Sequence, residues 1–475
     1  MRFHALLVCV LLLSGCAWAG PAGNVMRLEA EKAQLVGLAA VKEHPGYSGD
    51  GYVTGFDAAG DRAVFSFSAK SGLYELSVGY STPNGEKGYE IAVNSSKFSG
   101  MLPAIGKKFA AQAAGKVELV DGSNTIAVEK GWGWYDLDYI ELTPAKASPK
   151  PKKLPRKLAD PDAAPAARAL MGYLIDQYGS KTLSGQYDQY DQTEVDYIAK
   201  TTGKTPAILG GDLMDYSPSR KAHGQDPRNH VEQMIEGARK GFIITMCWHW
   251  NAPKDLLDTE KEPWWKGFYT QSTTFDVKKA MDNPDSEDYK LLVSDIDAIA
   301  VQLKKFSDAG VPVLWRPMHE AEGGWFWWGA KGPDAYIKLW RMMFDRLTKH
   351  HGLHNLIWVH NCVKPEWYPG DAYVDIVGVD GYPPDVTDPL SGTWDDLIKR
   401  FDGKKLLAVT EFGGVPDVRK MHRFGARWSF WVTWPGSFGP RKMTKEDLIR
   451  IYKDPLVMNR EDLKLPAAAK PKPAF

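Results

Sequence analysis

Two glutamates in this chain follow short apolar runs of the kind that form buried strands. Glu320 ends the segment Arg316-Pro-Met-His-Glu320, and Glu411 lies within Thr410-Glu-Phe-Gly413. Cleavage of a glycosidic bond needs such a pair, one carboxyl group to protonate the leaving oxygen and one carboxylate to act at the anomeric carbon. Either glutamate alone could instead cap a helix or pair with an arginine. The two together predict catalysis by Glu320 and Glu411.

Other polar and aromatic side chains also follow apolar runs. Flat aromatic faces suit sugars, because a pyranose ring presents C–H groups that pack on them. Asp after a strand can hydrogen-bond a sugar hydroxyl, although it is also a common N-cap of the next helix. The candidates that we expect around the substrate are Asp212, His249, His319, Trp325, Asp380, Tyr382 and Trp434.

The elements that would position these residues alternate between strand and helix patterns. Eight apolar runs lie at Thr182–Gly185, Ala207–Leu209, Phe242–Met246, Val311–Leu314, Leu356–Val359, Val374–Val379, Leu406–Val409 and Phe430–Val432. Helical faces lie between several of them, for example Val231, Met234, Ile235 and Ala238. The repeat predicts a (β/α)8 TIM barrel over residues 158–465, whose catalytic groups stand at the carboxyl ends of the strands. A doubly wound open sheet is the alternative, but no glycine-rich dinucleotide turn supports it.

The residues before the barrel have a different pattern. Ala63–Ser68, Leu73–Tyr80 and Tyr89–Val93 largely alternate between apolar and polar side chains and are separated by Gly, Asn and Pro turns. They predict an all-β sandwich module over residues 24–143. Residues 144–157 are rich in Pro and Lys and predict a semi-extended linker. A similar composition predicts a disordered tail at 466–475.

The first residues have the pattern of a signal peptide over 1–19. Arg2 precedes a short apolar run, Ala5–Leu13, which is too short to cross a membrane as a mature helix. Residues 13–16, Leu-Ser-Gly-Cys, resemble a bacterial lipobox that would attach a lipid to Cys16, while Ala17-Trp-Ala19 fits ordinary cleavage. We therefore expect either a secreted protein or a lipoprotein of the cell surface or outer membrane.

Charge and cysteine content restrict the partners. Lys+Arg and Asp+Glu both number 59, so no net field favours nucleic acid, and we expect none to bind. The only cysteines outside the signal region, Cys247 and Cys362, follow separate strands, so a disulfide is not expected. His319-Glu320 begins like a zinc-protease motif, but Gly323 replaces the second histidine. We expect a monomer whose catalysis needs no cofactor.

Four motifs in this order resemble glycoside hydrolase family 26. They are Leu183-Ser-Gly-Gln186, Cys247-Trp-His-Trp250, Arg316-Pro-Met-His-Glu320 and Thr410-Glu-Phe-Gly413. The resemblance implies a retaining endo-β-mannanase with Glu320 as acid/base and Glu411 as nucleophile. It also implies sugar contacts from His249, His319, Tyr382 and Trp434. Some members cleave xylan or mixed-linkage glucan, and the motifs do not separate these substrates.

The N-terminal segment resembles a family 35 carbohydrate-binding module. Leu28-Glu-Ala-Glu31 opens it, Tyr47-Ser-Gly-Asp-Gly51 follows, and Gly131–Leu142 closes it. The resemblance implies a structural Ca²⁺, for which Glu29, Glu31 and Asp138 supply hard oxygen ligands. Exposed edge-strand carboxylates are the alternative. Trp132 or Trp134 could stack on a sugar, and we expect one of the two in the core.

The function that these features favour is hydrolysis of β-1,4-mannan, galactomannan or glucomannan by double displacement. Two alternatives remain at this point. A xylanase or mixed-linkage glucanase would use the same two glutamates on another polymer. A non-catalytic, glycan-binding surface lipoprotein would have a degenerate barrel, and the presence of both glutamates argues against it.

Overall fold

The computed structural model describes residues 25–472 apart from 95, 147 and 189–191. The expected signal peptide and the lipobox cysteine lie outside these residues. The chain forms two compact units, 1–147 and 148–475, each of which is described by itself. Among the helices in the described ranges, none is long and apolar enough to cross a membrane.

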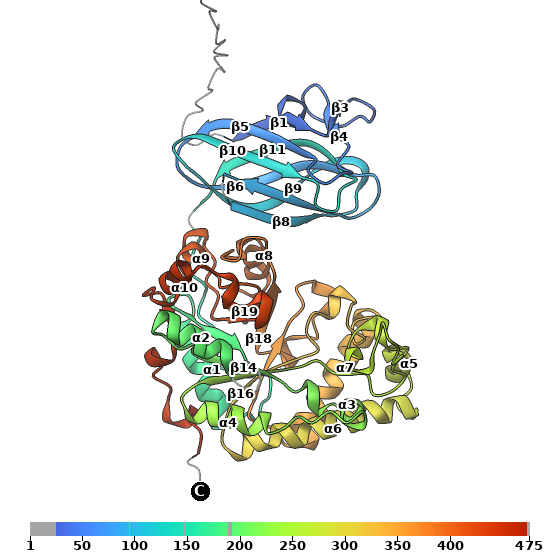
Figure 1. The fold of residues 1–475 in the computed structure, drawn as a ribbon, viewed down its shortest axis with the longest axis vertical. Helices are drawn as coiled ribbons and strands as arrows, with labels where there is room; N and C mark the ends of the chain where they lie inside the picture. The colour runs from blue at the N-terminus through green and yellow to red at the C-terminus, as the bar shows by residue number, and fades with distance from the viewer. Residues whose placement is uncertain (1–24, 95, 147, 189–191, 473–475) are drawn as a thin grey trace, which may run out of the picture. The chain divides into compact units, whose positions relative to one another are not determined.

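The first unit is the predicted antiparallel sandwich. One sheet has the order β3-β4-β11-β6-β9, with β1 also on β11, and the other has the order β2-β5-β10-β7-β8 (Figure 1). The buried faces of the two sheets share one hydrophobic core. The strands are β1 Met26–Glu29, β2 Gln34–Val36, β3 Ala39–Val41, β4 Tyr52–Thr54, β5 Arg62–Ala69, β6 Gly72–Thr82, β7 Lys87–Val93, β8 Ser96–Leu102, β9 Gly106–Leu119, β10 Gly122–Glu129 and β11 Asp136–Pro144.

The second unit confirms the predicted (β/α)8 barrel, in which parallel strands β13 to β20 close on themselves. These strands are β13 Gly185–Tyr187, β14 Ile208–Asp212, β15 Ile243–Trp248, β16 Val313–Pro317, β17 Leu356–His360, β18 Ile376–Gly381, β19 Leu406–Phe412 and β20 Trp431–Thr433. A short parallel pair, β12 Thr182–Leu183 and β21 Val457–Met458, lies outside the barrel.

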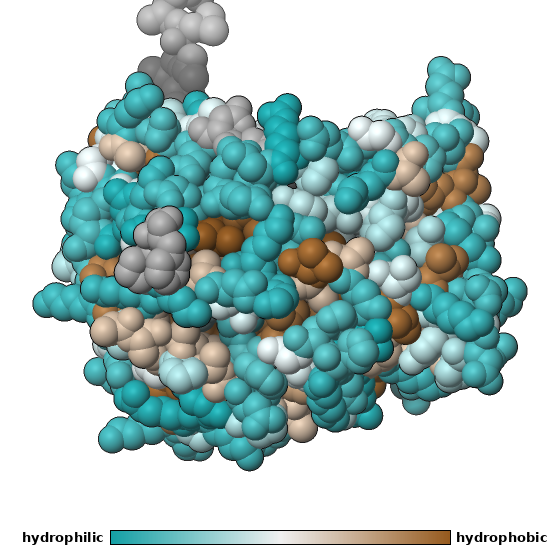
Figure 2. Space-filling model, turned by 90° about the horizontal axis from the view of Figure 1, so that it is seen from below, coloured by the Kyte–Doolittle hydropathy of each residue, from teal (hydrophilic) through white to brown (hydrophobic). Residues whose placement is uncertain are grey.

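Helices surround the barrel (Figure 1). They are α1 Pro165–Gln177, α2 Thr193–Thr202, α3 Pro218–Ala222, α4 His230–Arg239, α5 Val277–Asp282, α6 Glu287–Asp308, α7 Pro333–Asp345, α8 Ser391–Phe401, α9 Val418–Phe424 and α10 Lys445–Tyr452. The predicted apolar face of α4 is buried as expected. Hydrophobic side chains are thus turned inward, and the surface seen from below is mainly hydrophilic with scattered hydrophobic residues (Figure 2).

The strands differ from the predicted runs in ways that matter for the site. The run predicted as the first barrel strand, Thr182–Gly185, is mostly β12, and the barrel strand β13 begins only at Gly185. Several other strands continue beyond the predicted ends, so that Arg316 lies inside β16 and Glu411 inside β19. The apolar runs ended early in the prediction because polar residues were taken as loop.

The predicted linker and tail are partly wrong. Leu154 is buried in a hydrophobic cluster of the barrel, and the Lys152 amide donates to the Asp402 carboxylate at 2.8 Å. In the tail, Ala467–Ala469 form a 3-10 turn with Ala469 buried, and the Lys472 amide donates to the Ala309 carbonyl at 2.8 Å. The described parts of both segments thus contact the barrel, where Leu154 and Ala469 are buried in one hydrophobic cluster.

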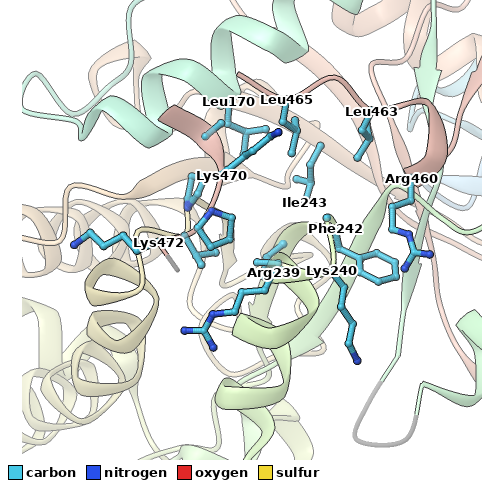
Figure 3. Close-up of a pocket in the computed structure, with 17 residues that line it drawn as sticks. Leu170, Arg239, Lys240, Phe242, Ile243, Arg460, Leu463, Leu465, Lys470 and Lys472 are labelled. Carbon is cyan, nitrogen blue, oxygen red and sulfur yellow. The ribbon is translucent and has the colours of Figure 1, made fainter. Parts of the chain in front are cut away.

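The tail also forms one wall of a pocket of about 590 Å³ (Figure 3). Apolar side chains such as Leu170, Phe242 and Leu463 line it, and basic residues stand around its rim. Ile243, the first residue of β15, belongs to this lining. The pocket therefore lies at the amino ends of the strands, opposite the end at which Glu320 and Glu411 stand.

Candidate active site

Arg316 lies at the centre of the site and is completely buried in β16. Its guanidinium donates to Asp380 at 2.7 Å, to Glu411 at 2.5 Å and to the Tyr187 hydroxyl at 3.0 Å. A planar guanidinium with several fixed donors suits this arrangement better than a lysine would. One side chain thus ties β16 to the ends of β13, β18 and β19.

Three carboxyl groups converge beside Arg316. One oxygen from each of Glu320, Asp380 and Glu411 lies within 4.8 Å of the other two. Asp380 and Glu411 are partners in the register of β18 and β19, next to a bulge after Val379. Glu320 approaches from the loop after β16. Two carboxyl groups this close can act on opposite sides of one bond held between them.

The three groups bind protons more readily than free carboxyl groups. Burial raises the pKa of Glu320, and the charge of Glu411 raises it further. Burial, followed by the charge of Asp380, raises the pKa of Glu411, while Arg316 opposes both. One cation cannot neutralise three carboxylates in a buried site, so the cluster retains a proton.

Hydrogen-bond donors indicate where that proton resides. Asp380 accepts from Arg316, from the Asn361 amide at 2.8 Å and from the Thr410 hydroxyl at 2.8 Å. These groups stabilise its ionised form. Glu320 hydrogen-bonds Asp380, and no hydrogen bond joins Glu320 to Arg316 among the described residues. Burial raises the pKa of Asp380 to about 7, although Arg316 opposes the rise. A hydrogen bond between two carboxyl groups needs one proton, which Glu320 and Asp380 therefore share. Glu411, bound by Arg316, is the anion of the pair.

The backbone of Glu320 has an unusual conformation. Its φ of 53° is in the left-handed region, which a residue with a side chain adopts only when neighbours hold it there. Its amide donates to the carbonyl and to the side-chain oxygen of Asn361, both at 3.1 Å. The Trp325 indole, 48% exposed, donates to the Glu320 carboxyl group at 2.9 Å. Glu320 is therefore oriented from both backbone and side chain.

Tyr382 contacts the other glutamate. Its hydroxyl donates to Glu411, and its ring is 43% exposed. A Cβ atom on Gly413 would come within 2.6 Å of the Tyr382 ring, so only glycine leaves the space that the ring occupies. The same relation holds between Gly210 and the Tyr187 ring, at 2.5 Å.

Two histidines and an aspartate form a second chain of contacts. Asp212 accepts from Nδ1 of His249 at 2.6 Å, and Nε2 of His249 lies 3.1 Å from Nε2 of His319. Burial lowers the pKa of His249, but the charge and the hydrogen bond of Asp212 raise it by more, so the pKa of His249 is raised overall. Burial lowers the pKa of His319 well below its usual value, with Arg316 and His249 adding to the effect. His319 is therefore the neutral member.

Aromatic rings surround these histidines. Trp434 lies 5.0 Å from the Tyr187 ring and 5.7 Å from the His249 ring, between centroids. Trp327 and Trp328 are buried, and the Trp328 indole donates to the His319 carbonyl at 2.9 Å. Of Trp325, Trp327 and Trp328, only Trp325 is exposed.

The nine residues predicted for the barrel site come together in one place. Asp212 and His319 are more buried than expected of sugar contacts, at 5% and 1% exposed, and Asp212 is bonded to His249 and to backbone amides. It orients His249 from behind. Arg316 and Tyr187 have no role in the predicted site, because the predicted strand ends put neither residue inside the barrel. An arginine four residues before Glu320 was the available signal.

Possible metal ligands occur in both units. In the described chain, Asp212, Cys247 and His249 also place ligand atoms within 4.8 Å of one another, but Asp212 and His249 already bond each other. In the sandwich, the Ser48 hydroxyl contacts Glu29 at 2.6 Å and Asp138 at 3.3 Å, and the Asp50 amide donates to Glu31 at 3.0 Å. One loop thus contacts all three predicted ligands, although Glu29, Glu31 and Asp138 are not among the described groups whose ligand atoms all lie within 4.8 Å of one another.

The tryptophans of the sandwich differ from the expectation that one would be core. Trp132 is 62% exposed and Trp134 is 54% exposed. Trp132 packs across Gly88, where a Cβ atom would come within 3.1 Å of the indole. Both rings are therefore available at the surface of the module.

Comparisons with known families agree with this division of the chain. The model described as glycosyl hydrolase family 26 matches residues 159–462. The model described as carbohydrate binding module (family 35) matches residues 26–145.

Relatives and solved structures span both units. The chain is 45% identical to a mannan endo-1,4-beta-mannosidase of Thermothelomyces thermophilus, over 88% of this chain and 86% of the relative. It is 33% identical to mannan endo-1,4-beta-mannosidase A of a Piromyces species, over 92% and 72%. The crystal structure of a Podospora anserina GH26-CBM35 beta-(1,4)-mannanase matches with a TM-score of 0.68 and 42% identity, over 94% of this chain and 99% of that one.

Replacing Arg316 with methionine should test its role in holding the site together. We expect a loss of about 3–5 kcal/mol in the free energy of unfolding near neutral pH, because two buried carboxylates lose their cation. The loss should shrink as the pH falls and these carboxyls take up protons. Urea unfolding followed by circular dichroism measures it. Arg239→Met, an exposed arginine, is the control, with an expected change within about 0.5 kcal/mol. Equal stability of both variants would contradict the role.

Proposed function

Since this chain belongs to glycosyl hydrolase family 26, and is therefore a glycoside hydrolase, we propose that it is a retaining endo-β-1,4-mannanase. Its substrates would be mannan, galactomannan and glucomannan, cut within the chain by double displacement. The observation that carries the proposal is the meeting of Glu320 and Glu411 beside Arg316.

In the first step, the Glu411 carboxylate attacks the anomeric carbon of the sugar before the cleaved bond. Glu320 gives its proton to the glycosidic oxygen as that bond breaks, and the shortened chain leaves with a new hydroxyl group. The product on the enzyme is an ester between the sugar and Glu411. Arg316 and Tyr382, which bond Glu411, keep it ionised and aimed before the attack.

In the second step, Glu320, now ionised, takes a proton from a water molecule. The water oxygen attacks the anomeric carbon and the ester bond to Glu411 breaks, which returns both groups to their starting states. Asp380, which hydrogen-bonds Glu320, helps Glu320 change between acid and base. His249, Trp434 and Trp325 would contact the sugars on either side of the cleaved bond.

The spacing of the carboxyl groups supports retention over inversion. An inverting enzyme keeps its carboxyl groups roughly 6.5–9.5 Å apart to admit a water molecule, whereas a retaining enzyme keeps them roughly 5–5.5 Å apart. One oxygen of Glu320 lies within 4.8 Å of one oxygen of Glu411, which favours the shorter spacing.

The choice of β-mannan rests on the names of the relatives. The proteins of Thermothelomyces and Piromyces are named mannan endo-1,4-beta-mannosidases, and each match extends over both units of this chain. Xylan and mixed-linkage glucan remain the alternative substrates for the same two glutamates. The exposed Trp132 and Trp134 would give the module a surface for a polysaccharide. A polymer of this size cannot enter a cell, which favours a secreted or surface-anchored enzyme.

A structural Ca²⁺ in the module forms a further part of the proposal. Glu29, Glu31 and Asp138 would hold it, with the Ser48 loop closing over them. The residues fit such a group, because Oε2 of Glu31 is buried without a hydrogen-bond partner among the described residues. Burial, and then the charges of Glu29 and Glu31, raise the pKa of Asp138 to about 6. A divalent cation would relieve this crowding of negative charge.

Azide should distinguish the roles of the two glutamates. We expect Glu320→Ala and Glu411→Ala each to lose at least about 10²-fold in kcat on galactomannan, whereas Glu366→Ala, an exposed control, stays active. With an activated aryl β-mannobioside and azide, Glu411→Ala should form the α-glycosyl azide, because azide attacks from the vacated face. Glu320→Ala should form the β-azide, because azide replaces water on the ester. NMR of the products decides this, and the same anomer from both variants would contradict the assignment.

Chelation should destabilise the sandwich and leave the barrel active. If Ca²⁺ at about 100 times its Kd contributes about 2.7 kcal/mol, its removal should lower the melting temperature of the sandwich by roughly 5–10 °C. Scanning calorimetry of the full chain with EDTA or Ca²⁺ measures the two transitions. The shift should vanish in Asp138→Asn and persist in the exposed control Glu75→Ala. Melting curves that are identical with and without EDTA would refute the metal.

A further inference from the structure

Phe438 is an exposed aromatic residue that contacts the machinery around Glu411. It ends the 3-10 turn Gly436–Phe438 after β20, and its side chain is 49% exposed. Its ring meets the Tyr382 ring edge to face, with centroids 5.3 Å apart and an interplanar angle of 81°. Edge-to-face packing is a favoured arrangement of two aromatic rings. Tyr382 in turn donates its hydroxyl to Glu411.

The backbone around Phe438 is tied to the strand that carries Glu411. The Phe438 carbonyl accepts from the Gly414 amide at 2.8 Å, and the Trp434 amide donates to the Phe412 carbonyl at 2.9 Å. Hydrogen bonds thus hold the backbone at Trp434 and at Phe438 against the end of β19 and the residues after it. The position of the Phe438 ring relative to Glu411 depends on these hydrogen bonds as well as on side-chain packing.

Tyr382 lies between two surfaces. On one side is Gly413, where a Cβ atom would come within 2.6 Å of the Tyr382 ring. On another is the Phe438 ring. Because Tyr382 is itself 43% exposed, these contacts limit how far its ring can swing toward solvent. A swing of the ring would break the bond from its hydroxyl to Glu411.

We propose that Phe438 is a positioning residue that holds the Tyr382 hydroxyl on Glu411 and offers its remaining exposed surface to the sugar bound beside Tyr382. The inference rests on the proposed function for its second part, since the sugar is that of the β-glycan substrate. Its first part concerns only the folded enzyme. Phe438→Leu separates the two parts of the proposal. Leucine fills much of the volume of the ring and should still support Tyr382, but it has no aromatic face for the sugar.

The hydroxyl of Tyr382 stabilises the ionised form of Glu411, so its loss should be visible in the pH profile of kcat/KM. The acidic limb of that profile reports ionisation of the nucleophile in the free enzyme. The other charged or titratable groups that face Glu411 are Arg316, Asp380, Glu320, His249, Tyr187, Cys247 and Tyr269. Among the described residues, the Phe438 side chain makes no hydrogen bond or ring contact with these groups, so its removal should act through Tyr382.

The test compares Phe438→Ala, Phe438→Leu and the surface control Val301→Ala on mannohexaose. We expect Phe438→Ala to move the acidic limb to higher pH and lower kcat/KM about tenfold, as the bond to a charged acceptor weakens. Phe438→Leu should keep the wild-type limb but raise KM. In a Tyr382→Phe background, Phe438→Ala should cause no further movement of the limb. The positioning role would be overturned if Phe438→Ala left the acidic limb unchanged, or if it moved the limb equally in the wild-type and Tyr382→Phe backgrounds. The sugar contact would be overturned if Phe438→Leu left KM unchanged.

A second measurement keeps this test apart from that of the proposed function. Protein labelled with 3-fluorotyrosine gives a ¹⁹F resonance for Tyr382 that Tyr382→Phe identifies without any substrate. Phe438→Ala should shift and narrow this resonance as the ring gains freedom, whereas Val301→Ala should not. An unchanged resonance would overturn the positioning role. A wild-type enzyme inactive on mannan would instead refute the proposed function and leave the ¹⁹F result to decide the role.

Discussion

One buried cation shared among several carboxyl groups sets the chemistry of this molecule. Arg316 binds Asp380 and Glu411 directly but does not bind Glu320, although the three carboxyl groups lie within reach of one another. A guanidinium is permanently charged, so the two groups that it binds are favoured as anions. In the mechanism that we propose, Glu320, which this arginine does not bind, carries the proton and acts as the acid, while Glu411 acts as the nucleophile. The proposed division of roles therefore depends on which carboxyl groups one arginine can reach.

The rest of the barrel positions this arginine and its partners. Parallel strands bring the ends of β16, β18 and β19 to one rim, and the extra residue Thr410 in β19 sets Asp380 opposite Glu411. Loops then supply what strands cannot, since Glu320 needs a left-handed backbone that Asn361 holds in place. Glycine matters where a ring must approach closely, as Gly413 allows for Tyr382. These constraints together hold the carboxyl groups, Arg316 and Tyr382 in one arrangement at the rim of the barrel.

Much of this arrangement could be predicted from the sequence, and the failures have a common cause. The apolar runs predicted both units, and the motifs around Glu320 and Glu411 predicted that these two carboxyl groups meet. Inside a barrel, however, polar residues continue the strands, so Arg316 and Glu411 were assigned to loops. Their hydrogen bonds join strands far apart in the chain and leave no local pattern. Leu154 and Ala469 were assigned to a linker and a tail because each is a single apolar residue in a polar segment. Their burial also depends on residues far away in the chain and leaves no local pattern.

The most direct test of this account is the protonation state of the two glutamates. Carboxyl ¹³C resonances of glutamate-labelled enzyme, assigned with Glu320→Gln and Glu411→Gln, can be followed by NMR between pH 4 and 8. The account predicts that Glu411 is ionised while Glu320 still holds its proton, so that Glu411 titrates at lower pH. It predicts that Arg316→Met removes this order. A proton that remains on Glu411 after Glu320 has ionised would contradict the division of roles by Arg316.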